Sequence, residues 1–264
     1  MSIFLKYEDC AVKINNSGIF ATDATFSMDA NVQVERLIDG SILKDSLGEP
    51  RYGATSPIKG QLSLTYYMDD NFSNFFDIFS MGEESVTGTF AGVEIQGMYL
   101  TSTSFSVEPF AAVPMSVTFD VYGPINSTNV SAQNINLTQS EVSLLNGATS
   151  FVSGSGIDGK IDHVQRFDYN ATAQRTPSYH IGENAPSRVS IDTIDVQMSV
   201  DAEKFGDDLS VNGNEARLNV TMRDLYDNTF SREFGCTGRI ISQQLSASSQ
   251  GYLQGNISVT QAFR

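Results

Sequence analysis

The chain has 264 residues, 40% of them hydrophobic, and a net charge of −15 from 31 acidic and 16 basic residues. This length allows one large domain or two ordinary ones, and the apolar content is far above that of a disordered chain. The acidic balance argues against a protein that grips nucleic acid by its phosphates. Because there is no run of about 18 apolar residues and no secretory signal, we expect no membrane helix and a chain made and kept in a cytoplasm.

Alternation of apolar and polar residues dominates the first part of the sequence. It begins with a short strand at Val12–Ile14 and a turn over 15–18, and it is strictest over residues 24–35, where Ala24, Phe26 and Met28 share one parity. A period of two predicts a long strand with one buried face. The pattern stops over Leu37–Thr55, a loop of a length that is usually functional or mobile.

A helix is predicted directly after the next strand. Phe72, Phe75, Phe76 and Phe79 follow the i, i+3, i+4, i+7 spacing of one helical face. Asp69 or Asp70 would be the N-cap and Gly82 would end the helix. Four phenylalanines could line a ligand pocket, but they are more often the contact of a helix with a sheet, which is the interpretation we adopt.

Further strands are predicted over 92–123, 189–198 and 216–222. The apolar parity changes at Gly97 and again near Thr193, and each change predicts a β-bulge. The second change falls in a stretch, Gly182–Asp201, that repeats the plan of Gly53–Asp69: a glycine, a proline shortly after, an alternating apolar run and a final aspartate.

These echoes predict a duplicated chain. Pro57 matches Pro186, and Met115–Thr118 matches Ile257–Thr260. We therefore expect a mainly β fold made of two tandem antiparallel units, each a β-sandwich or partial barrel with one short α-helix. The units span residues 1–128 and 141–264, with a linker at 129–140 inside an uncharged, Asn/Ser/Thr-rich stretch. The second helix would be a short one at 202–205.

No catalytic or metal-binding motif is found. His163 and His180 are the only histidines, and neither lies in a zinc or triad pattern. Cys10 and Cys236, the only cysteines, are interpreted as idle thiols in a reducing compartment, although a disulfide between them stays open. We expect a protein that is not an enzyme and needs no cofactor.

The arrangement resembles the tail tube proteins of bacteriophages. The resemblance rests on Ala30–Arg36, the long loop up to Tyr52–Ala54, and Ser56–Leu64 leading into the predicted helix. In that family, sheets of neighbouring subunits join edge to edge around a channel through which DNA leaves the capsid. The resemblance implies a virion protein of the tail, assembled in the bacterial cytoplasm. Two units per chain imply a trimeric ring with pseudo-sixfold symmetry.

The resemblance also implies partners and contact loops. The partners would be further copies of the chain, the tape measure, terminator and distal tail proteins, and DNA that passes without specific binding; no membrane is expected. Leu37–Thr55 and Asn170–Pro186 would contact the adjacent ring. The candidate ring-stacking residues are Ile42, Lys44, Asp45, Arg51, Tyr52, Arg175, Tyr179 and His180.

Two alternatives stay open. A baseplate hub or distal tail protein of the same fold fits nearly as well, although the absence of an appended domain favours the tube. In a different class, two tandem β-sandwiches could form an adhesin or a carbohydrate-binding protein. The chain has no Trp, the residue that such proteins often use to stack on sugars, and it shows no export signal.

Overall fold

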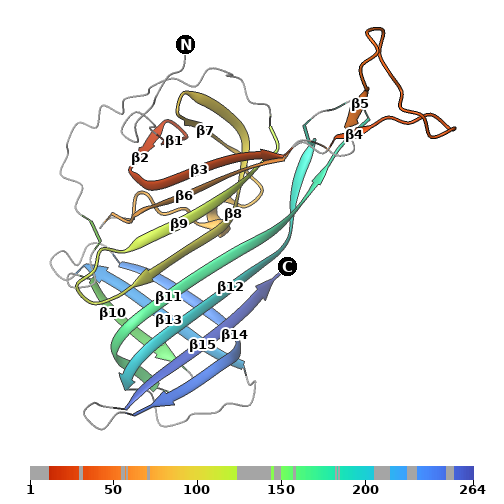
Figure 1. The fold of residues 1–264 in the computed structure, drawn as a ribbon. Helices are drawn as coiled ribbons and strands as arrows, with labels where there is room; N and C mark the ends of the chain where they lie inside the picture. Colours follow the sequence, from red (N-terminus) through yellow and green to blue (C-terminus); the bar gives the residue numbers. More distant parts are fainter. Residues whose placement is uncertain are drawn as a thin grey trace.

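The protein is mainly β (Figure 1). Its computed structural model describes residues 12–29, 32–54, 57, 59–69, 72–123, 144–145, 150–156, 159–181, 183, 185–204, 215–224, 231–247 and 253–264. Within these residues the chain forms strands β1 to β15 and one short helix, α1. The predicted mainly β fold is confirmed, and every printed strand pairing is antiparallel.

The first half forms a sheet that closes on itself, here called the N-terminal closed sheet. Its strands lie side by side in the order β3-β6-β9-β8-β7-β1-β2. Only Phe20 separates β2 from β3, so the last strand of this order runs directly into the first. The strands are β1 (Val12–Ile14), β2 (Ser17–Ile19), β3 (Ala21–Asp29), β6 (Lys59–Tyr67), β7 (Val86–Phe90), β8 (Val93–Val107) and β9 (Pro114–Val121).

The second half forms the C-terminal closed sheet. Its order is β10-β13-β14-β15-β12-β11, and β11 pairs back onto β10, which completes the circuit. The strands are β10 (Ser150–Gly156), β11 (Gly159–Ser178), β12 (Arg188–Lys204), β13 (Glu215–Asp224), β14 (Ser231–Ser246) and β15 (Gln254–Phe263).

The two closed sheets are joined by one strand pair, the internal seam. In this seam β8 pairs with β11 from Ser102↔Thr172 to Val107↔Phe167. The seam makes both halves part of one sheet. It crosses the predicted boundary between units, while the linker at 129–140 lies outside the described residues. The division into two domains therefore stays a prediction.

Each closed sheet has a dry interior. In β6, Leu62, Leu64 and Tyr66 are buried, whereas Gln61, which has the opposite parity, is exposed. At the internal seam the two interiors meet in a cluster of edge-to-face, tilted and stacked rings, with centroids between 5.1 and 6.0 Å apart. Its members are Phe75, Phe105, Phe167, Tyr169 and Phe234. Such pairs add stabilisation beyond area burial, about 0.5–1.5 kcal/mol each.

Both predicted bulges are confirmed. The β7–β8 register shifts between Val86↔Met98 and Gly88↔Ile95, and Gly97, at φ +61°, is in the extra segment. The β11–β12 register shifts between Gln174↔Thr193 and Arg175↔Ile191. In both strands the apolar residues change parity at the bulge. The extra residue of the bulge returns the second apolar run to the buried side of the sheet.

The predicted helix over Phe72–Phe79 is wrong in extent. Helix α1 covers only Ile78–Met81, its N-cap is Asp77 rather than Asp69 or Asp70, and Gly82 ends it as expected. Phe72 has φ +55°, which breaks a helix, and Asp69 instead accepts a hydrogen bond from the Ser73 amide. The spacing nevertheless marked a contact surface, because Phe72, Phe75 and Phe76 all pack on the core.

Two further expectations fail. The second helix is not formed where it is described, because Ala202–Lys204 belong to β12; Phe205 lies outside the described residues. The single long strand over 24–35 is also wrong. β3 ends at Asp29, and β4 (Val32–Val34) pairs with β5 (Tyr52–Ala54) in a separate two-stranded sheet.

Candidate interaction surfaces

Residues 32–54 form an arm that projects from the body (Figure 1). Its stem is the β4–β5 pair, and two short hairpins follow, each closed by one bridge: Arg36↔Ile42 and Lys44↔Pro50. Residues 37–54 of the predicted loop Leu37–Thr55 are thus a hydrogen-bonded structure, and Thr55 lies outside the described residues. Sequence periodicity missed it because its paired segments are only two or three residues long.

A cycle of three backbone hydrogen bonds holds the centre of the arm. The Glu35 amide donates to the Arg51 carbonyl, the Arg51 amide to the Leu43 carbonyl, and the Leu43 amide to the Glu35 carbonyl, each at 2.8–2.9 Å. Stem and hairpins therefore meet in a three-way junction. This geometry fixes the direction in which each hairpin points.

Both hairpin tips have the same construction. Asp39 accepts hydrogen bonds from the Ser41 amide and hydroxyl, and Asp45 accepts from the amides of Leu47 and Glu49. Gly40 and Gly48 take φ +83° and +85°, where a Cβ is unfavourable. The hydrogen bonds from Ser41 lower the pKa of the Asp39 carboxyl. Each tip is thus a defined turn.

The tips expose apolar side chains with no core behind them. Ile38 is fully exposed and Leu47 is 84% exposed. Tyr52, at the stem, is also exposed. An isolated two-stranded hairpin is marginally stable in water, so this arm gains stability once its tips are covered. An arm that keeps a fixed shape and shows apolar tips is typical of a contact element.

The other predicted stacking loop is mostly strand. Asn170–Ser178 belong to β11, so of the described residues in this segment only 179–181, 183 and 185–187 lie outside the sheet. His180 is exposed beside Glu183, and Ile181 is fully exposed. This end of the β11–β12 pair therefore offers a smaller contact surface than the expectation for Asn170–Pro186.

Arg175 is engaged inside the chain. Its Nε donates to the Leu100 carbonyl at 2.9 Å, and its Nη2 donates to the carbonyls of Gly82 and Leu100 at 2.8 Å. The guanidinium also lies 5.6 Å from the centroid of the Tyr99 ring. Burial lowers its pKa. Arg175 thus ties the end of α1 to β8 and β11.

A polar face continues across both closed sheets. One cross-strand row begins on β3 and ends on β14, and none of its side chains is buried. The row is Asp23, Thr65, Ser116, Ser104, Asn170, Gln197, Thr260 and Arg239, each paired with the next. A parallel row on β8, β11, β12, β15 and β14 is Ser106, Asp168, Ser199, Ser258 and Ser242. The internal seam does not interrupt this face.

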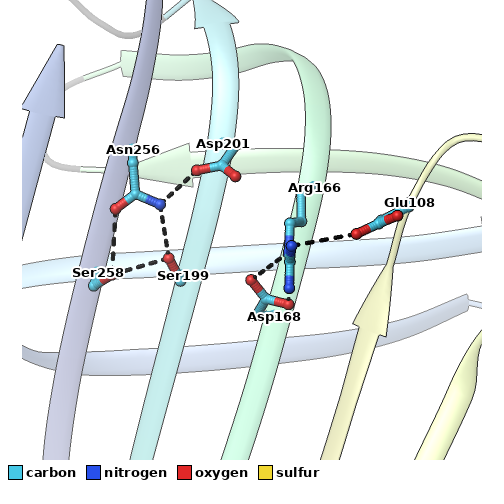
Figure 2. A network of polar contacts seen from close by, with 7 residues as sticks. All are labelled: Glu108, Arg166, Asp168, Ser199, Asp201, Asn256 and Ser258. Atoms are coloured by element: carbon cyan, nitrogen blue, oxygen red, sulfur yellow. Dashed lines mark hydrogen bonds and ion pairs between the residues drawn. The ribbon is translucent and has the colours of Figure 1, made fainter. Parts of the chain in front are cut away.

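Hydrogen bonds fix part of the polar face (Figure 2). Arg166 donates from Nε to both oxygens of Asp168, at 2.8 and 3.0 Å, and its Nη1 lies 3.3 Å from Glu108. Asn256 donates to Ser199 and Asp201. The carboxylates around Arg166 raise its pKa and neutralise its charge.

A polar hollow of about 400 Å³ lies beside this network, between the first part of β11, the ends of β12 and β14 and the start of β15. Its lining includes Glu108, Arg166 and Asp201 with several amides: Gln165, Gln244, Gln254 and Asn256. No group of His, Cys, Asp and Glu within the described residues is arranged to hold a metal ion. None of the described helices is long and apolar enough to cross a membrane.

No protein family model matches the chain, and no curated protein sequence matches it.

Proposed function

We propose that this protein is a bacteriophage tail tube protein, whose copies form rings that stack into a channel for genome passage. The observation that carries the proposal is the pairing of two closed sheets through one seam, with an uninterrupted polar face on one side and a projecting arm at one end. The chain would be a structural component of the virion, assembled in the bacterial cytoplasm. It would work without a cofactor or an active site.

The order of strands supports a duplication. Strands β1, β3, β6, β7, β8 and β9 of the first half lie in the order β1-β7-β8-β9-β6-β3. Strands β10 to β15, taken in chain order, lie in the corresponding order β10-β13-β14-β15-β12-β11. Even the hairpins match, because β1 pairs with β2 just before β3 as β10 pairs with the start of β11. Two independent sheets would rarely share such an order.

The arm supports stacking. It lies at one end of the long strands, and the end of β14 and the start of β15 lie at the other end (Figure 1). Residues of these two strand ends line the polar hollow. A head-to-tail stack of identical rings therefore brings the arm of one ring against the opposite end of the next. The proposed contact residues at the arm end are Ile42, Lys44, Asp45, Arg51, Tyr52, Tyr179 and His180. Arg175 would position its neighbours rather than reach the next ring.

The polar face supports a channel lining. Its rows consist mainly of Ser, Thr, Asn and Gln, and its carboxylates include Asp23, Asp168 and Asp195. Arg239 is the one cation in the two rows, and Arg166 beside them is paired with Asp168. DNA is a polyanion and binds proteins chiefly through Lys and Arg. A surface dominated by hydroxyls, amides and carboxylates, with a single arginine in its two rows, would let DNA pass without holding it.

Negative-stain microscopy of the purified protein tests the proposal. Rings or tubes with a central channel are expected, and a protein that stays dispersed at high concentration would overturn the tube function. Ile38→Ser and Leu47→Ser should abolish stacking but leave single rings, because they remove the apolar tips. Ser46→Ala, on the same tip as Leu47, is the matched control and should stack normally.

A further inference from the structure

The internal seam shows how one edge of β8 and one edge of β11 are used. Ser102–Ser104 pair with β9 on one side and β11 on the other, and Met98 pairs with both β7 and β9. Strands β7 and β11 therefore lie on the same edge of β8, one after the other. In the same way β10 and then β8 occupy one edge of β11, opposite β12.

Within the described residues, the equivalent edges elsewhere in the chain have no strand partner. Arg239 of β14 pairs with both β13 and β15, and beyond it, at 240–246, only the β15 edge has a partner among the described residues. Strand β3 likewise follows the β1–β2 pair, and among the strands that the structure describes it pairs only with β6. In strand order β14 corresponds to β8 and β3 corresponds to β11. The open edges are thus the two halves of a second seam that one chain cannot form with itself.

We propose that residues 240–246 of β14 in one copy pair antiparallel with residues 23–29 of β3 in the next, which repeats the internal seam between chains. The partner is a second copy of this chain. The contact is head to tail, so repeating it leads to a closed ring when the rotation closes. The inference needs only self-association and holds whether or not the rings stack.

Exposed apolar side chains mark both open edges. Met28 on β3 is 44% exposed and Ile241 on β14 is 52% exposed, and Phe20 and Leu245 are about equally exposed. An open edge with apolar side chains is an aggregation hazard in a free monomer unless a specific partner covers it. The pairing covers both edges at once. It also extends the polar face of one copy into that of the next, because Ser27 and Ser242 lie on that face.

The seam between copies is weaker than the internal one. Phe105, Phe167 and Tyr169 belong to the aromatic cluster of the internal seam. By strand order and parity, Ala24 and Phe26 of β3 take the places that Phe167 and Tyr169 of β11 have in the internal seam. On the other side, Gln243 and Leu245 of β14 take the places of the β8 side chains that face these rings. With only one aromatic ring at this seam, copies should separate on dilution while each chain stays folded.

Cysteine cross-linking tests the pairing. All variants carry Cys10→Ser. Ser27→Cys protein is mixed with either Ser242→Cys or Gln244→Cys protein, and each mixture is oxidised. Two partner positions on β14 are used because the bulge at Ile241 allows two registers. One of these mixtures should give a covalent dimer in nearly full yield. Each single variant alone should give none, because the contact is head to tail. A mixture of Ser27→Cys with Arg217→Cys on the exposed side of β13 is the matched negative control.

Edge-blocking variants supply an independent measurement. Met28→Lys and Ile241→Lys each place a charge on an open edge at a side chain that is already half exposed, so the fold is kept. Light scattering should show loss of the oligomer in both, with unchanged circular dichroism. Ile181→Lys, the same kind of change away from both edges, should keep it.

The outcomes separate the seam from the tube. Rings that form without either cross-link, or that survive both edge variants, would overturn the seam. Cross-linked rings that never stack would keep the seam and overturn the tube function.

Discussion

At the scale of single residues, Arg232 shows how the segment around α1 is fixed to the second half. Its guanidinium carbon lies 3.9 Å from the centroid of Phe75, and Nη2 lies 3.1 Å from the Asp77 carboxylate. The side chains of both ion-pair partners are mostly covered, at 32% and 22% exposure. A charge held over a ring and paired in partial burial stabilises more than an exposed ion pair.

Arg232→Ala should lower the free energy of unfolding by about 1–2 kcal/mol, since it removes the ring contact and the cation that pairs with the Asp77 carboxylate. Chemical denaturation monitored by circular dichroism measures this change. Arg239→Ala, on the same strand but exposed, should cost less than about 0.5 kcal/mol. Equal losses of unfolding free energy in the two variants would mean that the change in net charge is responsible, and not the contacts of Arg232 with Phe75 and Asp77.

Cys236 is a buried thiol whose chemistry follows from burial alone. It is buried in the second interior, near the carbonyls of Val196 and Val259, and burial raises its pKa to about 11. The folded state therefore disfavours the thiolate. Burial of the neutral Cys236 thiol therefore contributes fully to the free energy of unfolding below the ordinary thiol pKa. This contribution is lost as the pH rises towards about 11.

In a Cys10→Ser protein at pH 8, Cys236 should react with a thiol reagent about 100-fold more slowly in the folded than in the unfolded chain, because the thiolate is the nucleophile. The rate of colour formation with a chromogenic disulfide measures this. Thr237→Cys in a Cys236→Ser background is exposed and should react rapidly in the folded state. Comparable folded rates for positions 236 and 237 would contradict the burial argument.

At the scale of elements, the glycines of β14 separate a required position from a tolerant one. A Cβ at Gly238 would run into the backbone carbonyl of Thr260 on β15, next to the bulge at Ile240 and Ser242. A Cβ at Gly235 would meet only the side-chain oxygen of Asn219, at 3.1 Å. The first obstacle is backbone in a ladder, and the second is a side chain that can move.

Gly238→Ala should therefore lower the free energy of unfolding by about 2–4 kcal/mol, because β14 must move away from β15. Gly235→Ala, the same change three residues earlier, should change it by less than about 1 kcal/mol. Thermal or chemical unfolding of the two proteins gives the comparison. A tolerant Gly238→Ala variant would mean that the β14–β15 pair is looser than its register indicates.

Sequence periodicity predicted strands and bulges well, and predicted irregular segments poorly. The bulges at Gly97 and near Thr193 are visible as changes of parity, since one extra residue moves every following side chain to the other face. The helix was overextended because the spacing of Phe72, Phe75 and Phe76 on a folded-back loop matches a helical face. The arm has no period to detect, and its three-way junction depends on backbone hydrogen bonds that any residue can make.

The candidate surfaces divide in the same way. Ile42, Lys44 and Tyr52 could be chosen from sequence because they fall in a long unpatterned segment. The open edges of β3 and β14 could not, because an edge exists only once strand order is known. Sequence also placed Arg175 in a loop, whereas the bulge beside it turns its side chain inward to the Leu100 carbonyl.

At the scale of the whole molecule, the net charge of −15 opposes contact between copies, while the open edges favour it. The repulsion acts through solvent and depends on the Debye length, about 30 Å at 0.01 M salt and about 8 Å at 0.15 M. Backbone hydrogen bonds and apolar contacts across the edges are much less sensitive to salt. Association should therefore strengthen as salt is added, until the repulsion is screened.

Sedimentation velocity at matched protein concentration, with sodium chloride raised from about 0.01 M to 0.15 M, should show at least a tenfold rise in the association constant. Met28→Lys should abolish association at both salt concentrations, because it removes the edge contact and not the repulsion. A wild-type protein that dissociates as salt is added would mean that ion pairs between copies dominate. In that case the β3–β14 pairing would have to be replaced by a contact between charged surfaces.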